Sequence, residues 1–527
     1  MPGLNYQREW NLNDMFFSKI KVYLQSFSSA SKWLILLAGL SLLPALVVRF
    51  FPVYDYPHWV YQAHIIANLQ SFTDHFYISW LPVPNLGSTL PLLVLTPLLG
   101  AEMAVKVLVL INAFLFVIGY AYYIKGIDVN QIGLRYLGPV IVFNVFFFYG
   151  YLSFYLGLTI IVFTFGYLIR LTGPLTRKNI FNVALLSIIA YLCHLFIWLP
   201  IFLYTIISDL IERKTIKLSI SQLPPLLLFF IYAVARVGQE NMRVIPYNSI
   251  LNKLFSLVGP LIPFQRIDPF PSKLPILLLN LFVMGLIALV IFMGLLKNKR
   301  DGTPSTCRGD SLMYTLALLT VMGIVFPFTT IAGMGMADQR LIFIAALLAF
   351  PLLMSCLKVE FAPKLTIFIS IFVILVNLVS FIDTDKQLRV VDGAIKQIPH
   401  GKTIYTASFR NVPLYGECEP KLLNSGNGIF PLQWFPLYEF TERGDVVAET
   451  FSTAILKTKP NSQRQLYFGE FNTEQTQGAF LEKMNAENNT WDYVVIFRCP
   501  GKAIDVSPTW VLFDSGKYYD IYTKDVN

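Results

Sequence analysis

Residues 53–88 hold a concentrated set of titratable side chains. This segment contains three of the five histidines of the 527-residue chain and two aspartates, and it has no lysine or arginine. Carboxylates and imidazoles are the groups that most often move protons in enzymes, so this composition is typical of general acid and base chemistry. The candidates are Asp55, His58, Asp74 and His75, with Asp55 and His58 as the leading pair.

Structural roles are open for residues of the same segment. Asp55 precedes a Tyr-Pro pair, and an aspartate before a proline in the first helical turn is a good helix N-cap. His64 is followed by Ile65 and Ile66, which is typical of a packed histidine rather than a reactive one. Spacing alone does not choose between these roles.

A second candidate lies far along the chain, where the sequence GMGMADQR ends at Arg340 and an apolar run begins. A guanidinium is permanently charged and forms paired hydrogen bonds with phosphate, so Arg340 could bind a phosphate or diphosphate. Asp338 could orient that guanidinium. His194, which lies inside another apolar run, is a supporting candidate. Arg340 could equally be an interfacial anchor of its own helix.

Long apolar runs must position these residues. Hydrophobic residues make up 55% of the chain and charged residues only 14%, whereas soluble proteins are about 25% charged. A membrane span needs about 20 apolar residues, and most of the runs reach that length. The run 180–212 is long enough for two spans, so we expect about eleven spans and at most about thirteen. The runs are 33–52, 103–124, 136–150, 152–171, 180–212, 222–238, 274–297, 311–331, 340–357 and 364–382.

The distribution of charge predicts the orientation. Residues 1–382 carry 26 Lys and Arg against 14 Asp and Glu, a net charge of +12, and residues 383–527 carry a net charge of −3. Basic residues concentrate in alternate loops, and positively charged loops stay in the cytoplasm. We therefore expect a cytoplasmic N-terminus, with residues 53–102, the first outer segment, on the opposite side. The overall charge of +9 then reflects membrane orientation, and nucleic acid is not an expected partner.

We expect three domains in a cytoplasmic (inner) membrane protein: a cytoplasmic segment with an amphipathic helix at 1–32, a membrane domain at 33–382, and an extracytoplasmic mixed α/β domain at 383–527. Within the first outer segment, residues 90–100 are too short to span and should form a re-entrant or interfacial element. The predicted elements of the last domain are strands at 403–406, 445–450, 465–468 and 491–497, a helix at 476–487, and a closing hairpin over 509–522.

Cysteines give a weaker indication. Cys418 and Cys499 both fall in the last domain. In an oxidising compartment they could form a disulfide, and they could equally be free buried thiols.

Five motifs, in this order, resemble those of bacterial polytopic membrane proteins related to C-type (GT-C) glycosyltransferases, which use sugars linked to polyisoprenyl phosphate. The resemblance covers about residues 30–385. The motifs are Asp55-Tyr-Pro-His58, Phe76-Tyr-Ile-Ser-Trp-Leu-Pro-Val-Pro-Asn85-Leu86, Tyr149-Gly-Tyr-Leu-Ser-Phe-Tyr-Leu-Gly157, Cys193-His194-Leu-Phe and Ala337-Asp-Gln-Arg340.

The resemblance implies an enzyme that transfers a sugar from a polyprenyl-phosphate donor to a glycan, lipid or protein acceptor on the outer face of the membrane, in cell-envelope polysaccharide synthesis. It implies that Asp55 is the catalytic base of an inverting reaction and that Arg340 holds the donor phosphate. Several such enzymes bind a divalent metal through additional acidic residues. Here Tyr56 follows Asp55, so no paired-acid motif supports a divalent metal. A metal is possible on the resemblance alone, and the sequence makes no cofactor certain.

The alternative is a non-enzymatic transporter or flippase for a lipid-linked saccharide. Transporters often show internal repeats and interrupted helices. The two halves of this sequence show no convincing repeat, and the main intramembrane charges are Lys106 and Arg236. These observations favour the enzyme. A third possibility is a family member without turnover, whose last domain binds partners in an envelope assembly.

Overall fold

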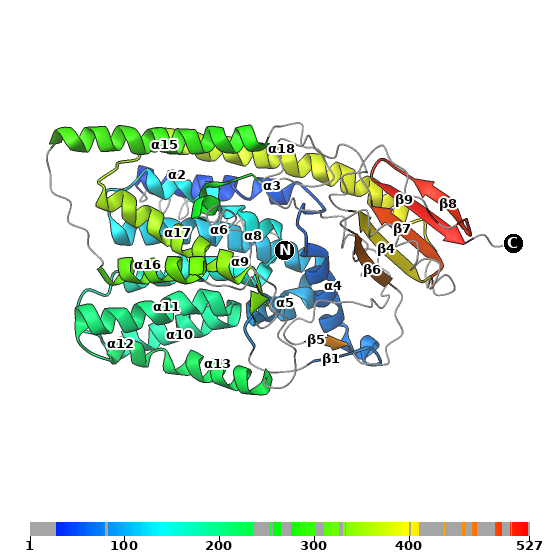
Figure 1. Ribbon diagram of the computed structural model, residues 1–527, viewed down its shortest axis with the longest axis horizontal. Helices are drawn as coiled ribbons and strands as arrows, with labels where there is room; N and C mark the ends of the chain where they lie inside the picture. Colours follow the sequence, from blue (N-terminus) through cyan, green and yellow to red (C-terminus); the bar gives the residue numbers. More distant parts are fainter. Residues whose placement is uncertain are drawn as a thin grey trace, which may run out of the picture.

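The computed structural model combines a bundle of helices with a small sheet at one end of the bundle (Figure 1). A helical membrane domain followed by strands is the architecture that the sequence predicts. The described residues are 28–78, 83–236, 253, 257–264, 276–301, 310–325, 330–331, 334–399, 402–409, 437, 456–458, 466–471, 491–497, 506 and 508–524.

The main helices coincide with the predicted apolar runs. The run 180–212 forms two helices that meet at His194, as expected. The helices are α2 (Ser29–Leu40), α3 (Leu43–Leu46), α6 (Ala101–Ile127), α7 (Gly138–Val142), α8 (Val145–Phe148), α9 (Leu152–Leu168), α10 (Arg177–Cys193), α11 (Leu195–Ser208), α13 (Leu223–Arg236), α15 (Ile276–Asp301), α16 (Asp310–Val325), α17 (Ala337–Cys356) and α18 (Pro363–Ile395). The remaining helices are α4 (Tyr56–Ala67), α5 (Leu86–Leu99) and α12 (Lys217–Ile220), with short helical turns at Leu69–Phe72, Leu134–Leu137, Asp209–Arg213 and Gly259–Leu261.

By length and composition, five helical segments of the described residues could cross a membrane. Shorter apolar helices account for most of the other predicted spans, so the number of crossings stays a prediction. The helix α5, within the first outer segment, has 14 residues and is also shorter than a bilayer requires. The five long segments are Ser29–Leu46, Ala101–Ile127, Leu195–Arg213, Ala337–Cys356 and Pro363–Ile395.

Two apolar runs depart from the expected single helices. The run 136–150 breaks after α7 because Asn144 starts a new helix, where its side chain accepts hydrogen bonds from the N–H groups of Phe146 and Phe147 at 3.0 and 3.3 Å. The run 33–52 stops being helical after Leu46. The non-helical residues that follow lead directly to Asp55.

Large apolar side chains project outward from several helices. Phe230 on α13 is 64% exposed, and Phe292 on α15 is 59% exposed. Contiguous apolar exposure of this kind is costly in water and is expected where helices face lipid.

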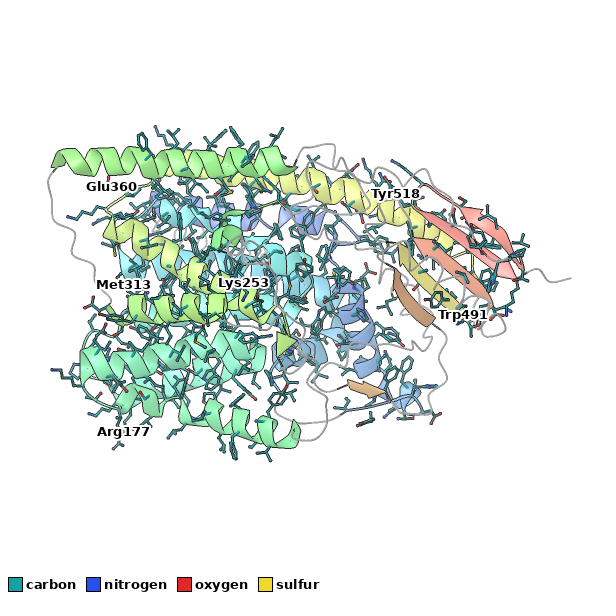
Figure 2. All side chains as sticks on the ribbon, viewed as in Figure 1. Arg177, Lys253, Met313, Glu360, Trp491 and Tyr518 are labelled. Carbon is teal, nitrogen blue, oxygen red and sulfur yellow. The ribbon has the colours of Figure 1, made fainter. Side chains whose placement is uncertain are left out.

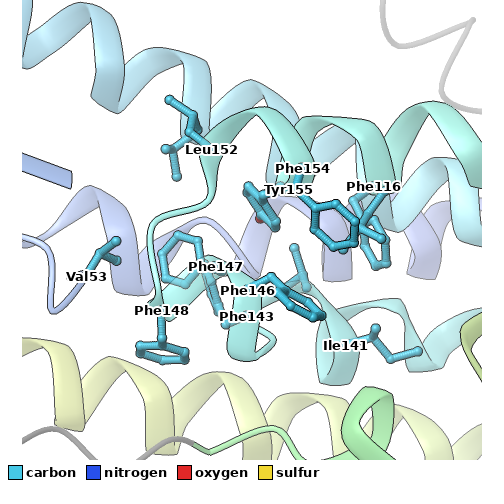
Figure 3. Close-up of a cluster of buried hydrophobic side chains, with 14 of the residues drawn as sticks. Val53, Phe116, Ile141, Phe143, Phe146, Phe147, Phe148, Leu152, Phe154 and Tyr155 are labelled. Atoms are coloured by element: carbon cyan, nitrogen blue, oxygen red, sulfur yellow. The ribbon is translucent and has the colours of Figure 1, made fainter. Parts of the chain in front are cut away.

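An aromatic cluster fills the interior behind the non-helical residues that lead to Asp55 (Figure 3). Phe146 contacts the rings of Phe154 and Phe343, with centroids 4.7 and 5.0 Å apart. Phe143 packs on Phe147 at 4.9 Å. The short α7 and α8 pieces therefore supply the core that joins α9 to α17.

The sheet has the strand order β6-β4-β7-β9-β8, with β4 parallel to both of its neighbours and the β8–β9 pair antiparallel. It confirms the predicted strands near 403, 465 and 491 and the closing hairpin. The strands are β4 (Ile404–Phe409), β6 (Leu466–Phe471), β7 (Tyr493–Phe497), β8 (Trp510–Ser515) and β9 (Tyr519–Lys524), with a separate two-stranded pair of β2 (Thr330–Ile331) and β3 (Met334–Gly335).

Two connections join the residues after 382 to the rest of the molecule. The helix α18 continues past residue 382, where the sequence places a domain boundary, and leads into β4. Strand β1 (Phe76–Ile78) pairs antiparallel with β5 (Leu456–Thr458), so that Phe76 lies opposite Thr458.

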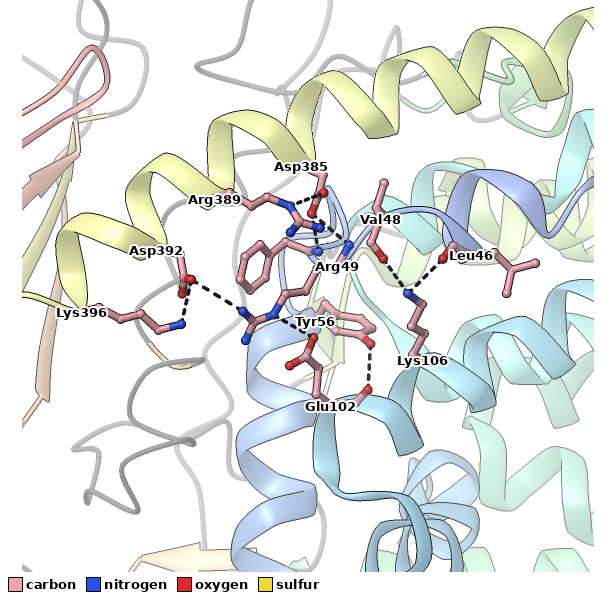
Figure 4. A network of polar contacts seen from close by, with 11 residues as sticks. Leu46, Val48, Arg49, Tyr56, Glu102, Lys106, Asp385, Arg389, Asp392 and Lys396 are labelled. Atoms are coloured by element: carbon pink, nitrogen blue, oxygen red, sulfur yellow. Dashed lines mark hydrogen bonds and ion pairs between the residues drawn. The ribbon is translucent and has the colours of Figure 1, made fainter.

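The C-terminal part of α18 also contacts the residues that precede Asp55 through a set of charged side chains, here called the junction network (Figure 4). Asp385 accepts hydrogen bonds from the backbone N–H groups of Arg49 and Phe50 at 3.0 and 2.7 Å. Lys106 donates to the Val48 carbonyl at 2.6 Å. The network consists of Arg49, Glu102, Lys106, Asp385, Arg389, Asp392 and Lys396.

Several predictions fall outside the described residues, namely the amphipathic helix near 12–27, the strand at 445–450, the helix at 476–487, and Cys418 and Cys499. Cys193 is a buried free thiol. Cys356 is disulfide-bonded, which the sequence analysis did not predict.

Candidate active site

Asp55 lies at the start of α4, held against the 149–151 segment. Its backbone N–H donates to the carbonyl of Tyr149 at 3.3 Å, and the Trp59 indole donates to the carbonyl of Gly150 at 2.8 Å. Gly150 has φ +76°, and a Cβ there would lie 2.7 Å from the Asp55 nitrogen. Only glycine fits this approach, which explains its place in the Tyr149-Gly-Tyr151 motif.

The Asp55 carboxyl group does not serve as a helix cap. The residue occupies the N-cap position, but its side chain makes no capping hydrogen bond. It is 4% exposed, and within the described residues its Oδ1 has no hydrogen-bond partner. Burial raises the pKa of Asp55 well above its usual value, and the charge of Arg340 partly opposes this shift. A buried carboxylate with a raised pKa is a stronger base than one in water.

His58 follows one turn into α4 and is 2% exposed. Its backbone N–H donates to the Asp55 carbonyl at 3.1 Å. Burial lowers the pKa of His58 below its usual value, so its ring is neutral at neutral pH. The ring can therefore help to orient a ligand beside Asp55 without adding a charge.

Arg340 lies in the first turn of α17 and is 5% exposed. Its guanidinium carbon lies 4.3 Å from the ring centre of Tyr151 and 5.1 Å from that of Phe154. Its Nη1 lies within hydrogen-bonding distance of Nε2 of His194. Asp55 interacts electrostatically with both Arg340 and Tyr151. These five residues, Asp55, Tyr151, Phe154, His194 and Arg340, form the site cluster.

Asp338, which from the sequence could orient the Arg340 guanidinium, pairs with a lysine in the structure. Its carboxylate, fully buried, contacts Nζ of Lys253 at 3.5 Å. Lys253 also donates to the carbonyls of Gly323 and Ile324 at the end of α16, at 3.2 Å each. Figure 2 shows Lys253 in the middle of the bundle. Lys253 therefore fixes the start of α17, and with it Arg340.

Asp74 and His75 lie away from the site cluster. They follow the far end of α4, at the turn before β1, and the 12 residues of α4 extend about 18 Å. The Asp74 side chain is exposed. His64 is near the same end, with its ring 5.7 Å from that of Phe72. Of the candidate residues, the structure brings together Asp55, His194 and Arg340.

Described residues of two remaining motifs pack next to the site cluster. Asn85 adopts the left-handed conformation, with φ 86°, where α5 begins, and Ser153 donates to its carbonyl at 2.9 Å. A Cβ on Gly87 would lie 2.6 Å from the Cys193 sulfur. The glycine therefore lets α5 approach the α10–α11 break closely, next to His194.

A metal ion would need several of these side chains as ligands. Among the described residues, no group of three or more His, Cys, Asp or Glu side chains is arranged to hold one. The site cluster offers one carboxylate and one imidazole, together with the positively charged guanidinium of Arg340. This donor set does not fit a metal ion of the usual coordination number.

The comparisons with known proteins bear on the fold. No protein-family model matches the chain, and no curated protein sequence matches it. The structure is similar to the crystal structure of ArnT from Cupriavidus metallidurans bound to undecaprenyl phosphate, with a TM-score of 0.50 and 9% sequence identity, over 94% of this chain and 99% of that chain. The chain is therefore a polytopic membrane protein with a GT-C-like fold, as its motifs predicted.

Proposed function

We propose that this protein is an inner-membrane glycosyltransferase that takes its sugar from a polyprenyl-phosphate donor on the outer face. The observation that carries the proposal is that one buried cluster holds an arginine and a carboxylate without a capping role, and that the two interact electrostatically. The fold shared with ArnT, whose crystal structure holds undecaprenyl phosphate, supports a lipid phosphate as part of the donor.

The chemistry divides between Asp55 and Arg340. An acceptor hydroxyl gives its proton to the Asp55 carboxylate as its oxygen attacks the anomeric carbon of the donor sugar. The bond between that carbon and the phosphate oxygen breaks, and its electron pair leaves with the polyprenyl phosphate. Attack from the face opposite the leaving group inverts the anomeric configuration.

Arg340 would stabilise the charge that develops on the leaving phosphate oxygen. Its burial makes this effect large, because charges interact more strongly where water is excluded. The rings of Tyr151 and Phe154 lie against the guanidinium. Its Nε, which has no hydrogen-bond partner within the described residues, could donate to a phosphate oxygen. His58 would orient the acceptor or the donor sugar as a neutral ring.

The test is Asp55→Asn in the purified full-length protein. The protein is incubated with a panel of undecaprenyl-phosphate-linked sugars and with envelope glycans, lipids and proteins as acceptors, and released undecaprenyl phosphate is measured. Loss of a general base should slow transfer by about 10³-fold. The matched control is Asp74→Asn, which changes an exposed carboxyl group of the same outer segment and should leave the rate unchanged.

Two results would count against the proposal. Full activity of Asp55→Asn would remove this residue from the mechanism. Movement of a lipid-linked sugar across proteoliposomes by the wild-type protein, without sugar transfer to any acceptor, would favour a flippase instead.

A further inference from the structure

The break between α10 and α11 fixes the protonation of one histidine ring. His194 has extended backbone angles, φ −170° and ψ 142°, and is the N-cap residue of α11. Its Nδ1 accepts a hydrogen bond from the backbone N–H of Phe196 at 3.1 Å. A ring nitrogen that accepts a hydrogen bond carries a lone pair and no proton. In the neutral ring, the one proton must then be on Nε2.

That proton points at another donor. Nε2 of His194 faces Nη1 of Arg340, and an arginine has no lone pair to offer. Two N–H donors that face one another cannot satisfy each other. An acceptor atom that both donors can reach would satisfy both.

Arg340 interacts with the Tyr151 side chain and with the charge of Asp55, and it still has an unused donor. The Nε of Arg340 is buried, with no hydrogen-bond partner among the described residues. Asp338, the acidic residue nearest to Arg340 in sequence, is held by Lys253. The 14-residue helix α11 begins directly after His194, and the N-terminus of a helix favours negative charge. An anion with several oxygens would complete this set of groups.

We propose that His194 is a hydrogen-bond donor to the phosphate of the lipid-linked substrate, through Nε2–H, and that it shares this phosphate with Arg340. This inference rests on the proposed function and deepens it. His194 is then a binding residue whose ring keeps a single tautomer because the other nitrogen caps α11. It moves no proton during the reaction.

Two substitutions test the roles of the two ring nitrogens of His194 separately. His194→Asn keeps an acceptor at the position of Nδ1, where asparagine is a good N-cap, and removes the distal donor. His194→Gln keeps a distal N–H donor and loses the cap. The first variant should therefore affect ligand binding, and the second should affect mainly thermal stability.

The measurement is binding of undecaprenyl phosphate, compared with undecaprenol, to the full-length protein in detergent. Wild-type protein should prefer the phosphate. His194→Asn should unfold at the wild-type temperature and bind undecaprenyl phosphate at least about 10-fold more weakly, the loss expected for a hydrogen bond to a charged group, with undecaprenol binding unchanged. His194→Gln should unfold at a lower temperature and keep most of the preference for phosphate.

A second measurement reports the tautomer directly. Nitrogen NMR of protein labelled at histidine, with the His194→Asn spectrum subtracted, should show His194 protonated at Nε2 alone. A proton at Nδ1, or wild-type phosphate binding by His194→Asn, would overturn the inference. If Asp55→Asn is inactive while His194→Asn binds normally, only this inference fails. If wild-type protein does not prefer phosphate over alcohol, this inference and the lipid-phosphate donor fail together.

Discussion

The site cluster and the junction network both bury charged side chains, but they use them differently. In the junction network, Asp385 accepts two backbone hydrogen bonds and pairs with Arg389 at 2.8 Å. In the site cluster, Oδ1 of Asp55 and Nε of Arg340 have no hydrogen-bond partner among the described residues. Asp55 and Asp385 are nearly equally buried, at 4% and 6% exposed, so burial does not distinguish the two regions.

Ion pairing does distinguish them. Each acidic side chain of the junction network lies within 4 Å of a basic one, whereas Asp55 has no ion pair of that length within the described residues. A buried polar group without a partner lowers the free energy of unfolding. Such groups are concentrated at functional sites, where they act on a ligand or substrate. The charges of the junction network position the first outer segment, and those of the site cluster remain available to a ligand. Lys106, one of the few intramembrane charges noted in the sequence, has a structural role because it caps the carbonyls of Leu46 and Val48.

The sharpest test of this contrast compares one arginine from each region. Arg340→Ala should slow sugar transfer by about 10³-fold, the effect of removing a buried group that stabilises charge in the transition state. Arg389→Ala should change the rate less than about 3-fold, because Arg389 is half exposed and its ion pair is with Asp385, outside the site cluster, and exposed ion pairs contribute little. Both rates are measured with saturating acceptor. Equal losses in the two variants would erase the distinction between the regions.

The next largest effect is expected at Lys253. Lys253→Met leaves the carboxylate of Asp338 buried without its ion-pair partner, which should lower the free energy of unfolding by about 3 kcal/mol. The double variant Lys253→Met with Asp338→Asn removes both charges and should recover most of that loss. Thermal unfolding in detergent reports both changes. A single variant as stable as wild type would mean that this pair does not fix the start of α17.

The smallest expected effect is on stability, and it has opposite signs when Asp55 and Asp385 are each replaced by asparagine. Because burial raises the pKa of Asp55, the folded protein binds its proton more tightly than the unfolded chain does. Above the unfolded pKa, folding therefore costs free energy, and this cost increases as the pH rises towards the folded pKa. Asp55→Asn should unfold at or above the wild-type temperature at about pH 7, with a smaller gain at about pH 5.

Asp385→Asn should do the opposite, because it weakens charge-assisted hydrogen bonds and lowers stability by about 1 kcal/mol. The unfolding temperatures of both variants are measured side by side across the same pH range. Destabilisation by Asp55→Asn at neutral pH would show that its carboxylate has a structural partner after all.

Local features of the sequence predicted much of the fold. Apolar length alone located the helices, since a long apolar run can satisfy its backbone in lipid only as a helix. The break in the run 136–150 was missed, because hydropathy does not register the capping side chain of Asn144. The strands near residue 491 and the closing hairpin followed from β-branched and aromatic residues between turn signals.

The site was only partly predictable. Residue types and positions in the sequence identified Asp55, His194 and Arg340 as separate candidate site residues. Their proximity depends on tertiary packing, which the sequence did not reveal. From the sequence, Asp338 could orient Arg340, but residues two apart on a helix do not face each other, and Asp338 contacts Lys253 instead. Lys253 carried no signal beyond its charge, because its partners lie about 70 and 85 residues away in the sequence.

The pairing of β1 with β5 has a consequence for biogenesis. Phe76 lies opposite Thr458, so this strand of the first outer segment has no β5 partner until the ribosome has reached residue 458. Contacts between residues so far apart in sequence form late. The helices between these two strands can therefore insert in order while β1 has no partner, and the later synthesis of residues 456–458 completes the pair.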